Sequence, residues 1–331
     1  MAAIVLVLLG TSCARAVPWG GRVDGSSRLK PPTAVMQRST TRTLRYRVME
    51  AIRVGHGPMG VAAAFGSIWV ANHEEDTVSR IDPRIARVVA TIRVGNGPGH
   101  LVPGYGSLWV SDDKDAFLWR IDPRTNSATR VAAGGRIACV PAAGLGTIWF
   151  TVWDPATLVA VDPATATVIA RLRVDSQPLG VQVAGGSLWV ASAEGGGHLL
   201  RIDAATGRIT ARLSVLSDWS WLQGYSVGAG SLWVANPFVQ TVARVDVRTN
   251  ALVAVLPVGY VNVATFADGA LWVADVNRTL LRIDPETYRT TDTIRVGTSL
   301  GGVASGFGSI WVTNYSDDAL SRIALSPEPS A

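Results

Sequence analysis

The chain has very few cysteines and histidines. Its 331 residues include two cysteines, Cys13 and Cys139, and Cys13 falls in an N-terminal segment that we expect to be removed. Cys139 would then be the only thiol, so no disulfide could form within the mature chain. There are four histidines and no His-x-x-x-His pair, and this spacing gives no indication of a zinc site.

Long apolar runs and concentrated charge are also missing. The apolar run at residues 2–9 is too short to cross a bilayer, so we expect no transmembrane segment. The formal net charge is +5, but residues 1–43 contain all of this excess. The remainder is formally neutral and has no basic stripe with interleaved aromatic residues. This composition argues against a nucleic-acid partner.

The N-terminus has the features of an export signal. The apolar run at 2–9 is followed by Ala14-Arg15-Ala16, which has the small-x-small pattern of a cleavage site. We therefore predict a signal peptide over residues 1–16 and an exported protein, either secreted or held in the periplasm or at the cell surface. A lipid anchor at Cys13 is the alternative. Residues 17–43 are rich in Gly, Ser, Pro and Thr and predict a flexible basic linker.

What the chain does have is a repeat. The phrase Gly-Ser-Ile/Leu-Trp-Val or a close variant begins at Gly66, Gly106, Gly146, Gly186, Gly230, Gly269 and Gly308. The spacing is about 40 residues, a period typical of folds in which each repeat buries its apolar face against the next. The repeat therefore predicts one array rather than two unrelated domains.

Each repeat contains four short apolar runs rich in Val, Ile and Trp and bounded by Gly, Pro, Asn and Asp. Such runs predict a four-stranded antiparallel sheet, and none is long or periodic enough for a helix. The first two runs are almost continuously apolar, as expected for a sheet covered on both faces. We predict an all-β fold, a seven-bladed β-propeller over residues 44–331.

The two ends of the chain are complementary. The seventh repeat stops after its third strand, and residues 47–55 match the fourth-strand segment 87–95 of the first repeat at six of nine positions. The N-terminal strand is therefore expected to complete the last blade and close the ring, which leaves no long open edge.

One polar register follows the Trp-containing strand, two residues past Trp-Val. Five of its seven members are Asn72, Asp112, Asn236, Asp275 and Asn314. These oxygens are candidate ligands for Mg²⁺ or Ca²⁺ at the mouth of the channel. The alternative is that each side chain bonds its own loop backbone, which requires no cofactor. The histidines fall in loops on the same face, where we expect them to be solvated, and His100 is a candidate general base beside Asp112.

The interval between the fourth and fifth copies is longer, 44 residues, because of insertions at 194–198 and near 217–221. Insertions on one face of a repeat protein often lie at the binding face. Aromatic residues at comparable heights are candidate walls of a ligand cleft, namely Trp153, Trp219, Trp221, Tyr260 and Tyr315. The alternative is that Trp219 and Trp221 plug the channel or cap the fifth blade.

The repeat resembles the YVTN-type propeller repeat and the propellers of the virginiamycin B (streptogramin) lyase family. The matching phrases include Gly-Ser-Ile-Trp-Val-Ala-Asn from Gly66 and Val-Ser-Arg-Ile-Asp-Pro from Val78. The first group implies an exported bacterial binding protein. The lyases imply a metal-dependent elimination that uses His and Glu on the top face. At the corresponding His positions this chain has Met59, Gly99 and Leu179.

From these patterns we expect an exported, monomeric and non-catalytic module with no required cofactor. It would bind a small molecule or a protein on the face that carries the insertions of the fourth and fifth blades. The alternative is a divalent-metal-dependent lyase, or a hydrolase resembling the sugar lactonases, with His100, Asp112 and Asp275 as its candidate catalytic residues.

Overall fold

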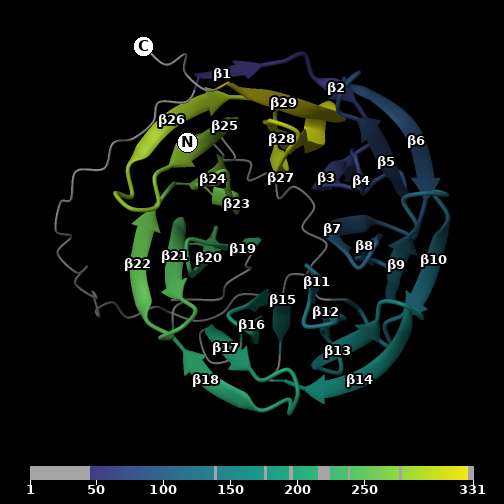
Figure 1. The fold of residues 1–331 in the computed structure, drawn as a ribbon, viewed down its shortest axis with the longest axis vertical. Coiled ribbons are helices and arrows are strands. Elements are labelled where there is room, and N and C mark those ends of the chain that lie inside the picture. The colour runs from purple at the N-terminus through teal and green to yellow at the C-terminus, as the bar shows by residue number, and fades with distance from the viewer. Residues whose placement is uncertain are drawn as a thin grey trace, which may run out of the picture.

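The structure is a computed structural model. It describes residues 45–137, 140–174, 177–193, 197–214, 224–237, 239–259, 261–275 and 278–326. The described strands form seven antiparallel sheets arranged as blades around a common axis, with the first strand of each repeat innermost (Figure 1). The predicted all-β, seven-bladed propeller is thereby confirmed. In the described residues, no helix is long and apolar enough to cross a membrane.

From the axis outward, the first three blades follow the chain order. Blade 1 contains β3 (Pro58–Ala64), β4 (Ser67–Asn72), β5 (Thr77–Asp82) and β6 (Arg87–Arg93). Blade 2 contains β7 (Pro98–Gly104), β8 (Ser107–Asp112), β9 (Phe117–Ile121) and β10 (Ala128–Ala132). Blade 3 contains β11 (Ala142–Gly144), β12 (Thr147–Val152), β13 (Thr157–Asp162) and β14 (Thr167–Arg173).

The next three blades repeat the same order. Blade 4 contains β15 (Pro178–Ala184), β16 (Ser187–Ser192), β17 (His198–Ile202) and β18 (Ile209–Leu213). Blade 5 contains β19 (Gly224–Gly228), β20 (Ser231–Asn236), β21 (Thr241–Asp246) and β22 (Leu252–Pro257). Blade 6 contains β23 (Val261–Ala267), β24 (Ala270–Asp275), β25 (Thr279–Ile283) and β26 (Thr290–Arg295).

Blade 7 joins the two ends of the chain. It contains β27 (Leu300–Gly306), β28 (Ser309–Asn314) and β29 (Ala319–Ser326), with a 3₁₀ turn, η2 (Tyr315–Asp317), before β29. Two N-terminal strands, β1 (Arg45–Val48) and β2 (Ile52–Arg53), pair antiparallel with β29 and complete this blade. The predicted closure is therefore confirmed, with the difference that two short strands take the place of one.

The repeated tryptophans lie between neighbouring blades. Each is at most 4% exposed, and the set comprises Trp69, Trp109, Trp149, Trp189, Trp233, Trp272 and Trp311. Trp69, for example, packs in one buried cluster with Leu108 and Val110 of blade 2. Each indole N–H also donates to the carbonyl five residues earlier, at 3.0–3.2 Å. A buried indole thus has a polar partner, which its position in the core requires.

An arginine from the third strand covers the tryptophan in six blades. The guanidinium carbon lies 4.9–6.0 Å from the ring centroid for Arg80, Arg120, Arg201, Arg244, Arg282 and Arg322. In five of these blades Nε also donates to the serine of Gly-Ser-x-Trp, at 2.9–3.0 Å. Arg80 continues to the Pro123 carbonyl of the next blade, at 2.6 Å. We call this arrangement the Arg–Trp pair, and it links adjacent blades.

Candidate functional site

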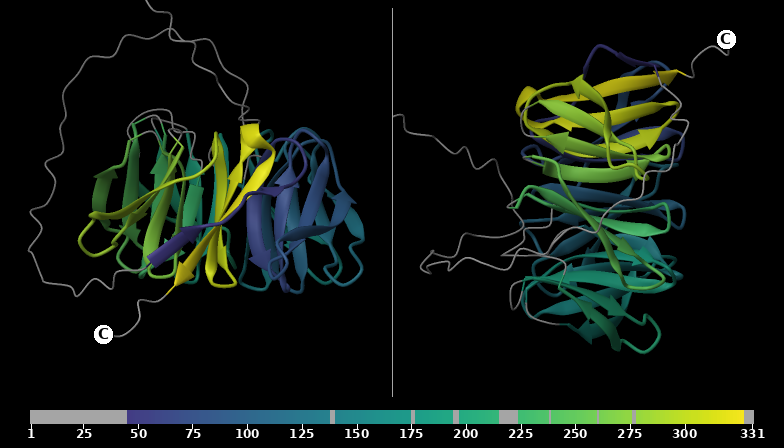
Figure 2. Two further views of the ribbon diagram at one scale, coloured as in Figure 1. Left: turned by 90° about the horizontal axis from the view of Figure 1, so that it is seen from above. Right: turned by 90° about the vertical axis from the view of Figure 1, so that its left-hand side faces the viewer.

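The propeller has two faces, seen edge-on in Figure 2. We call upper the face that carries the loops between second and third strands and the connections between blades. The lower face carries the turns between first and second strands and between third and fourth strands. The Asp-Pro turns of the lower face cap themselves, as Asp162 does by accepting the backbone N–H groups of Ala164 and Thr165 at 2.7 and 3.2 Å. The candidate site residues lie on the upper face.

The Asn/Asp register lies at the upper end of each second strand and is mostly buried. Asn72 and Asp112 are 0% exposed, and the Asn72 amide donates to the hydroxyls of Thr77 and Ser79, both at 2.9 Å. A Cβ on Gly55, in the connection above, would lie 2.6 Å from Nδ2 of Asn72. The glycines of the Val-Gly-x-Gly connections therefore make room for these side chains.

Asp112 is fully engaged with its own loop and strand. Its carboxylate accepts hydrogen bonds from the backbone N–H groups of Asn96 (2.9 Å), Lys114 (3.2 Å) and Asp115 (2.9 Å), and from the Trp119 indole (3.3 Å). Burial raises the pKa of this carboxyl, and the hydrogen bonds act in the opposite direction. His100 is not among these four donors. Within the described residues, the structure therefore shows no hydrogen bond between Asp112 and His100, the candidate general base.

The remaining members of the register are spread around the ring. Asn236 accepts from the Val239 N–H at 3.4 Å, and the Asn314 amide donates to Ser321 at 2.9 Å. The half-buried Asp275, in blade 6, accepts from Thr279 at 3.4 Å. Asp275 and Asp112 therefore belong to separate blades.

The contacts of the register leave few oxygens for a metal ion. Among the residues that the structure describes, no group of three His, Cys, Asp or Glu side chains could hold a metal ion. Two amide oxygens, Oδ1 of Asn72 and Oδ1 of Asn314, are buried without a hydrogen-bond partner, but they lie in different blades. Hard cations such as Mg²⁺ and Ca²⁺ need several converging oxygens. The described donors do not fit such a site, and the Mg²⁺ or Ca²⁺ hypothesis stays a prediction.

His100 lies on the inner strand β7 and is half-buried. Burial lowers the pKa of its imidazole to about 4, so the ring is neutral at pH 7. Its backbone N–H donates to the Ser111 hydroxyl at 3.0 Å. The side chain is therefore a neutral imidazole close to the axis of the ring.

We expected the loop histidines to be solvated, and for His73 this prediction is wrong. It is 2% exposed, and a Cβ on Gly97 would lie 2.9 Å from its Cε1 atom. Burial lowers its pKa, while the Asp113 charge and a hydrogen bond to the Pro98 backbone act in the opposite direction. Asp113 is 3% exposed. His73 of blade 1 and Asp113 of blade 2 are thus both buried, and close enough for the Asp113 charge to act on the imidazole.

Sequence reasoning missed this pair, although a signal existed. His73, Asp113 and Trp153 each directly follow the Asn/Asp register position, at intervals of 40 residues. The backbone N–H of each donates to the connection that precedes its blade, as His73 does to the Gly57 carbonyl at 3.0 Å. The repeat fixes the backbone at the position directly after the register, but the residue type there differs from blade to blade. This position is therefore where the upper face varies between blades.

Trp153 lies at a hollow of the upper face. A pocket of about 490 Å³ is lined by Trp153, Asp154, Pro155, Ala156, Arg173, Val174 and Gln177. Trp153 is half-buried and packs on the apolar cluster of blades 4 and 5 that includes Leu179 and Trp189. The pocket thus lies on blade 3, on the side facing blade 4.

The other predicted wall residues do not share this pocket. Trp219, Trp221 and Tyr260 lie outside the described residues. Tyr315 is on η2 in blade 7, and its hydroxyl donates to Glu74 Oε1 of blade 1 at 2.6 Å. Burial raises the pKa of this phenol. Since blades 3 and 7 are separated by at least two other blades (Figure 1), the structure keeps Trp153 and Tyr315 apart.

Comparison with known proteins supports the fold class. No family model and no curated protein matches the chain. Among solved structures, "Streptogramin B lyase structure" superposes with a TM-score of 0.72 and 16% identity, over 85% of this chain and 98% of that chain. "Kuenenia stuttgartiensis Hydrazine Synthase" also superposes at 0.72, with 12% identity, over 89% of this chain and 100% of that chain.

These similarities define the class of protein. The chain is a β-propeller with the fold of streptogramin B lyase, and the predicted resemblance to the virginiamycin B lyase propeller is confirmed at the level of fold. Identities of 12–16% carry the fold and no more. Function must therefore be argued from the upper face itself.

Proposed function

We propose that the protein is a binding module whose ligand enters the pocket beside Trp153. The observation that carries this proposal is a half-buried tryptophan that forms one wall of a hollow of about 490 Å³. That volume lies within the range of small-molecule sites. Aromatic side chains at such sites supply large contact area at little conformational cost.

The lining of the pocket indicates the ligand class. Trp153, Pro155 and Val174 offer apolar contact, while Arg173 and Gln177 offer hydrogen-bond donors. The matching ligand is a small amphipathic molecule with a planar or branched apolar group and a carboxylate or amide. Trp219 and Trp221, in the insertion predicted near 217–221, remain predicted contributors from the sequence pattern alone.

Export and a monomeric state belong to the same proposal. The apolar run at 2–9 and the small-x-small segment ending at Ala16 support a signal peptide. Completion of blade 7 by β1 and β2 supports a monomer, since it leaves β29 with partners on both sides. Attachment of a lipid at Cys13 is the alternative to free export.

The second candidate function is that of a lyase, favoured by the structural similarity to streptogramin B lyase and by the neutral imidazole of His100. Elimination needs a base to remove a proton, and an imidazole with a lowered pKa is deprotonated at pH 7. The carboxylates predicted to hold a metal, Asp112 and Asp275, lie in separate blades. A lactonase-like hydrolase would need the same metal-binding carboxylates. We therefore place binding first.

Ligand-observed NMR with the full chain tests the binding proposal. The probes are N-acetyl-phenylalanine, N-acetyl-leucine and their amides. Trp153→Ala is expected to weaken the bound signal about tenfold or more, as removal of an aromatic anchor does. Tyr315→Ala is the matched control, because it removes another upper-face aromatic from outside the pocket. Equal binding by wild type and Trp153→Ala would contradict the proposal.

Two assays decide between the candidate functions. Ring opening of streptogramin B by the wild-type chain with Mg²⁺, lost in His100→Ala, would establish the lyase in place of the binding module. Melting curves with EDTA and with millimolar Mg²⁺ or Ca²⁺ test the predicted cation, since a bound ion at 100 times its dissociation constant stabilises by about 2.7 kcal/mol.

A further inference from the structure

The lower face carries an unusual set of residues in its tight turns. The first and second strands of each blade are joined by two-residue turns whose first residue has a left-handed backbone. Left-handed φ favours Gly, Asn and Asp, and hairpin turns of this kind are normally Asn-Gly or Asp-Gly. Four blades instead place bulky apolar residues there, with φ of 53° at Phe65, 50° at Tyr105, 56° at Leu145 and 53° at Phe307.

These four side chains are also exposed to solvent. Phe65 is 38% exposed, and Tyr105, Leu145 and Phe307 are 45–46% exposed. Each position therefore carries two unfavourable terms, a left-handed backbone at a bulky residue and an apolar group in water. Strained positions of this kind tend to be kept where they serve a function.

The four residues are neighbours. They occupy consecutive blades 7, 1, 2 and 3, and we call Phe307, Phe65, Tyr105 and Leu145 the apolar arc. Adjacent inner strands meet just before these turns, since a Cβ on Gly306 would lie 2.5 Å from Cβ of Ala63, and one on Gly104 would lie 2.4 Å from Cβ of Ala143. The same turn position holds Gly185, Ala229 and Asp268 in blades 4, 5 and 6. The arc thus covers one side of the ring.

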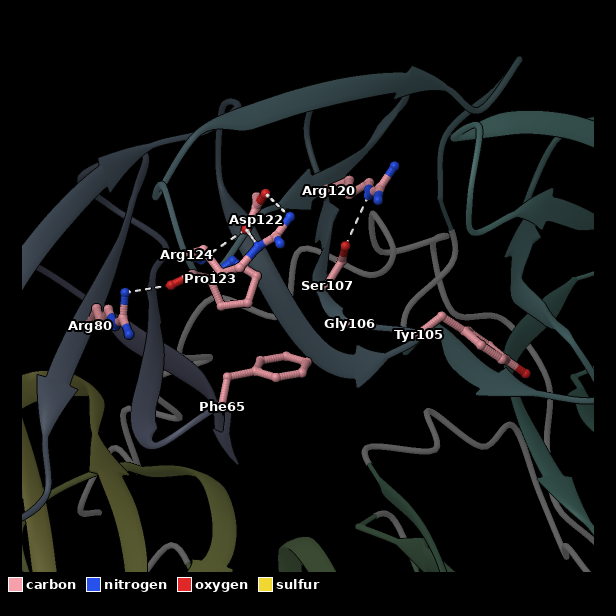
Figure 3. Close-up of a pocket in the computed structure, with 9 residues that line it drawn as sticks. All are labelled: Phe65, Arg80, Tyr105, Gly106, Ser107, Arg120, Asp122, Pro123 and Arg124. Atoms are coloured by element: carbon pink, nitrogen blue, oxygen red, sulfur yellow. Dashed lines mark hydrogen bonds and ion pairs between the residues drawn. The ribbon is translucent and has the colours of Figure 1, made fainter.

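A pocket in the middle of the arc adds positive charge. It has a volume of about 660 Å³, and its lining includes Phe65 and Tyr105 (Figure 3). Its charged lining residues are Arg80, Arg120, Arg124 and Asp122, and the Asp122 carboxylate is paired with Arg124 at 3.4 Å. The lining therefore has an excess of two positive charges, which attracts a carboxylate to a hollow that Phe65 also lines.

We propose that the apolar arc and this pocket bind an acidic, aromatic peptide segment of a partner protein. Apolar side chains of the segment cover the arc, and a carboxylate enters the pocket toward Arg80 and Arg120, the two lining arginines that Asp122 does not neutralise. A peptide fits better than a bilayer for two reasons. The charge lies inside a hollow, and the equivalent turns of blades 4 to 6 are small or acidic, so the ring does not present a uniform apolar rim.

Fluorescence anisotropy with the full chain tests this proposal. The probes are fluorescein-labelled heptapeptides that alternate glutamate with phenylalanine, with lysine in place of glutamate as the charge control. The acidic peptide is expected to bind, more weakly as salt is raised, and the lysine peptide is not. The variant Phe65→Asn with Tyr105→Asn is expected to lower affinity about tenfold or more.

The same variant provides an internal check on folding. Asparagine suits a left-handed turn residue, so the melting temperature is expected to rise rather than fall. Ala229→Asn in blade 5 is the matched control, because its φ is 49° and it lies outside the arc. It is expected to raise the melting temperature without changing peptide affinity.

Three results would overturn the proposal. These are equal binding of the acidic and lysine peptides, wild-type affinity in the Phe65→Asn, Tyr105→Asn variant, and no peptide binding together with capture of the chain by phosphatidylcholine–phosphatidylserine vesicles. The last result would identify the arc as a lipid contact instead. A fall in melting temperature of the arc variant would refute the strain on which the argument depends.

Discussion

Blades 2 and 3 have the same backbone plan but opposite chemistry. Their equivalent residues are 40 positions apart, and β8 and β12 are buried along their whole length. Blade 2 has Asp112 and Arg120 where blade 3 has Val152 and Ala160. The innermost segments differ in the same way, since blade 2 has His100 and blade 3 has Val140 at the equivalent position. A blade therefore forms with either a polar network or plain apolar packing in these positions.

The comparison shows which residues define a blade and which are free to vary. Trp109 and Trp149 are shared, and each donates to a carbonyl at the foot of its inner strand at 3.2 Å. The upper-face position changes from the buried Asp113 to the half-buried Trp153. Since the tryptophan core keeps the backbone in place, this position is available for a pocket. The candidate ligand site thus lies in the blade that lacks the polar network.

The largest expected effect concerns the shared tryptophans. Trp109→Ala and Trp149→Ala should each lower the free energy of unfolding by about 3–5 kcal/mol, because each leaves a cavity between blades. Trp109→Ala should cost about 1 kcal/mol more, since Arg120 covers that ring and blade 3 has no equivalent arginine. Urea unfolding of both variants measures the difference. An equal or larger cost in blade 3 would contradict the stated role of the arginine.

The next effect concerns Asp112. Asp112→Val, which copies blade 3, should cost about 2–3 kcal/mol, because the Asn96 N–H and the Trp119 indole lose their acceptor while the loop remains that of blade 2. Asp112→Asn keeps one acceptor oxygen and should cost less. Thermal unfolding of the two variants compares them. If Asp112→Val were as stable as wild type, the network would be dispensable in its own blade.

The pH dependence of stability distinguishes His100 from Val140. The folded pKa of about 4 lies below the unfolded value, so the unfolded chain binds a proton first as pH falls. The stability that neutral His100 contributes to the folded chain is fully present above about pH 6.5. It is lost toward pH 4, by about 2 kcal/mol. His100→Val should remove this part of the slope, as measured by urea unfolding across that range. His73 remains in both proteins and cancels in the difference.

The smallest effect is expected from the Arg–Trp pair of blade 2. Arg120→Ala removes a stacked guanidinium and its bonds to Ser107 (2.9 Å) and to the Ala164 carbonyl (3.0 Å). Because the group is only half-buried, the cost should be about 1 kcal/mol. Arg120→Lys keeps the charge but loses the planar fork, so it should recover little of this loss. Denaturant midpoints of the two variants are the measurement, and an unchanged midpoint in Arg120→Ala would show that the pair adds no stability.

Much of the fold follows from local sequence, but the site does not. The period of Trp69 and its six equivalents predicts the blades, and the truncated last repeat predicts the closure by β1 and β2. The burial of His73 depends on Gly97 and Asp113 of the next blade, so a local pattern cannot predict it. Likewise, the recurring arginine is visible in the sequence, yet its partner, such as Pro123 for Arg80, belongs to another repeat.

The irregular parts of the upper face are the least predictable. Trp153 and Tyr315 occupy the same position in their repeats, and only the ring geometry shows that Trp153 lines a pocket of blade 3 while Tyr315 bonds Glu74 of blade 1. For the apolar arc, the positions in the fold are predictable from sequence and the exposure of the side chains is not. Its turn positions are predictable from the glycine that follows each one, whereas exposure of Phe65 and Phe307 depends on what the assembled ring leaves uncovered.

The closure of blade 7 also bears on how quickly the ring can form. The pairing of β1 with β29 joins residues about 280 positions apart, whereas the strands within the other blades are neighbours in sequence. The entropy of closing a loop grows with its length, and contacts between distant residues slow folding. Blades 1 to 6 can therefore assemble from local hairpins, and the seam in blade 7 is the step that sets the folding rate of the whole ring.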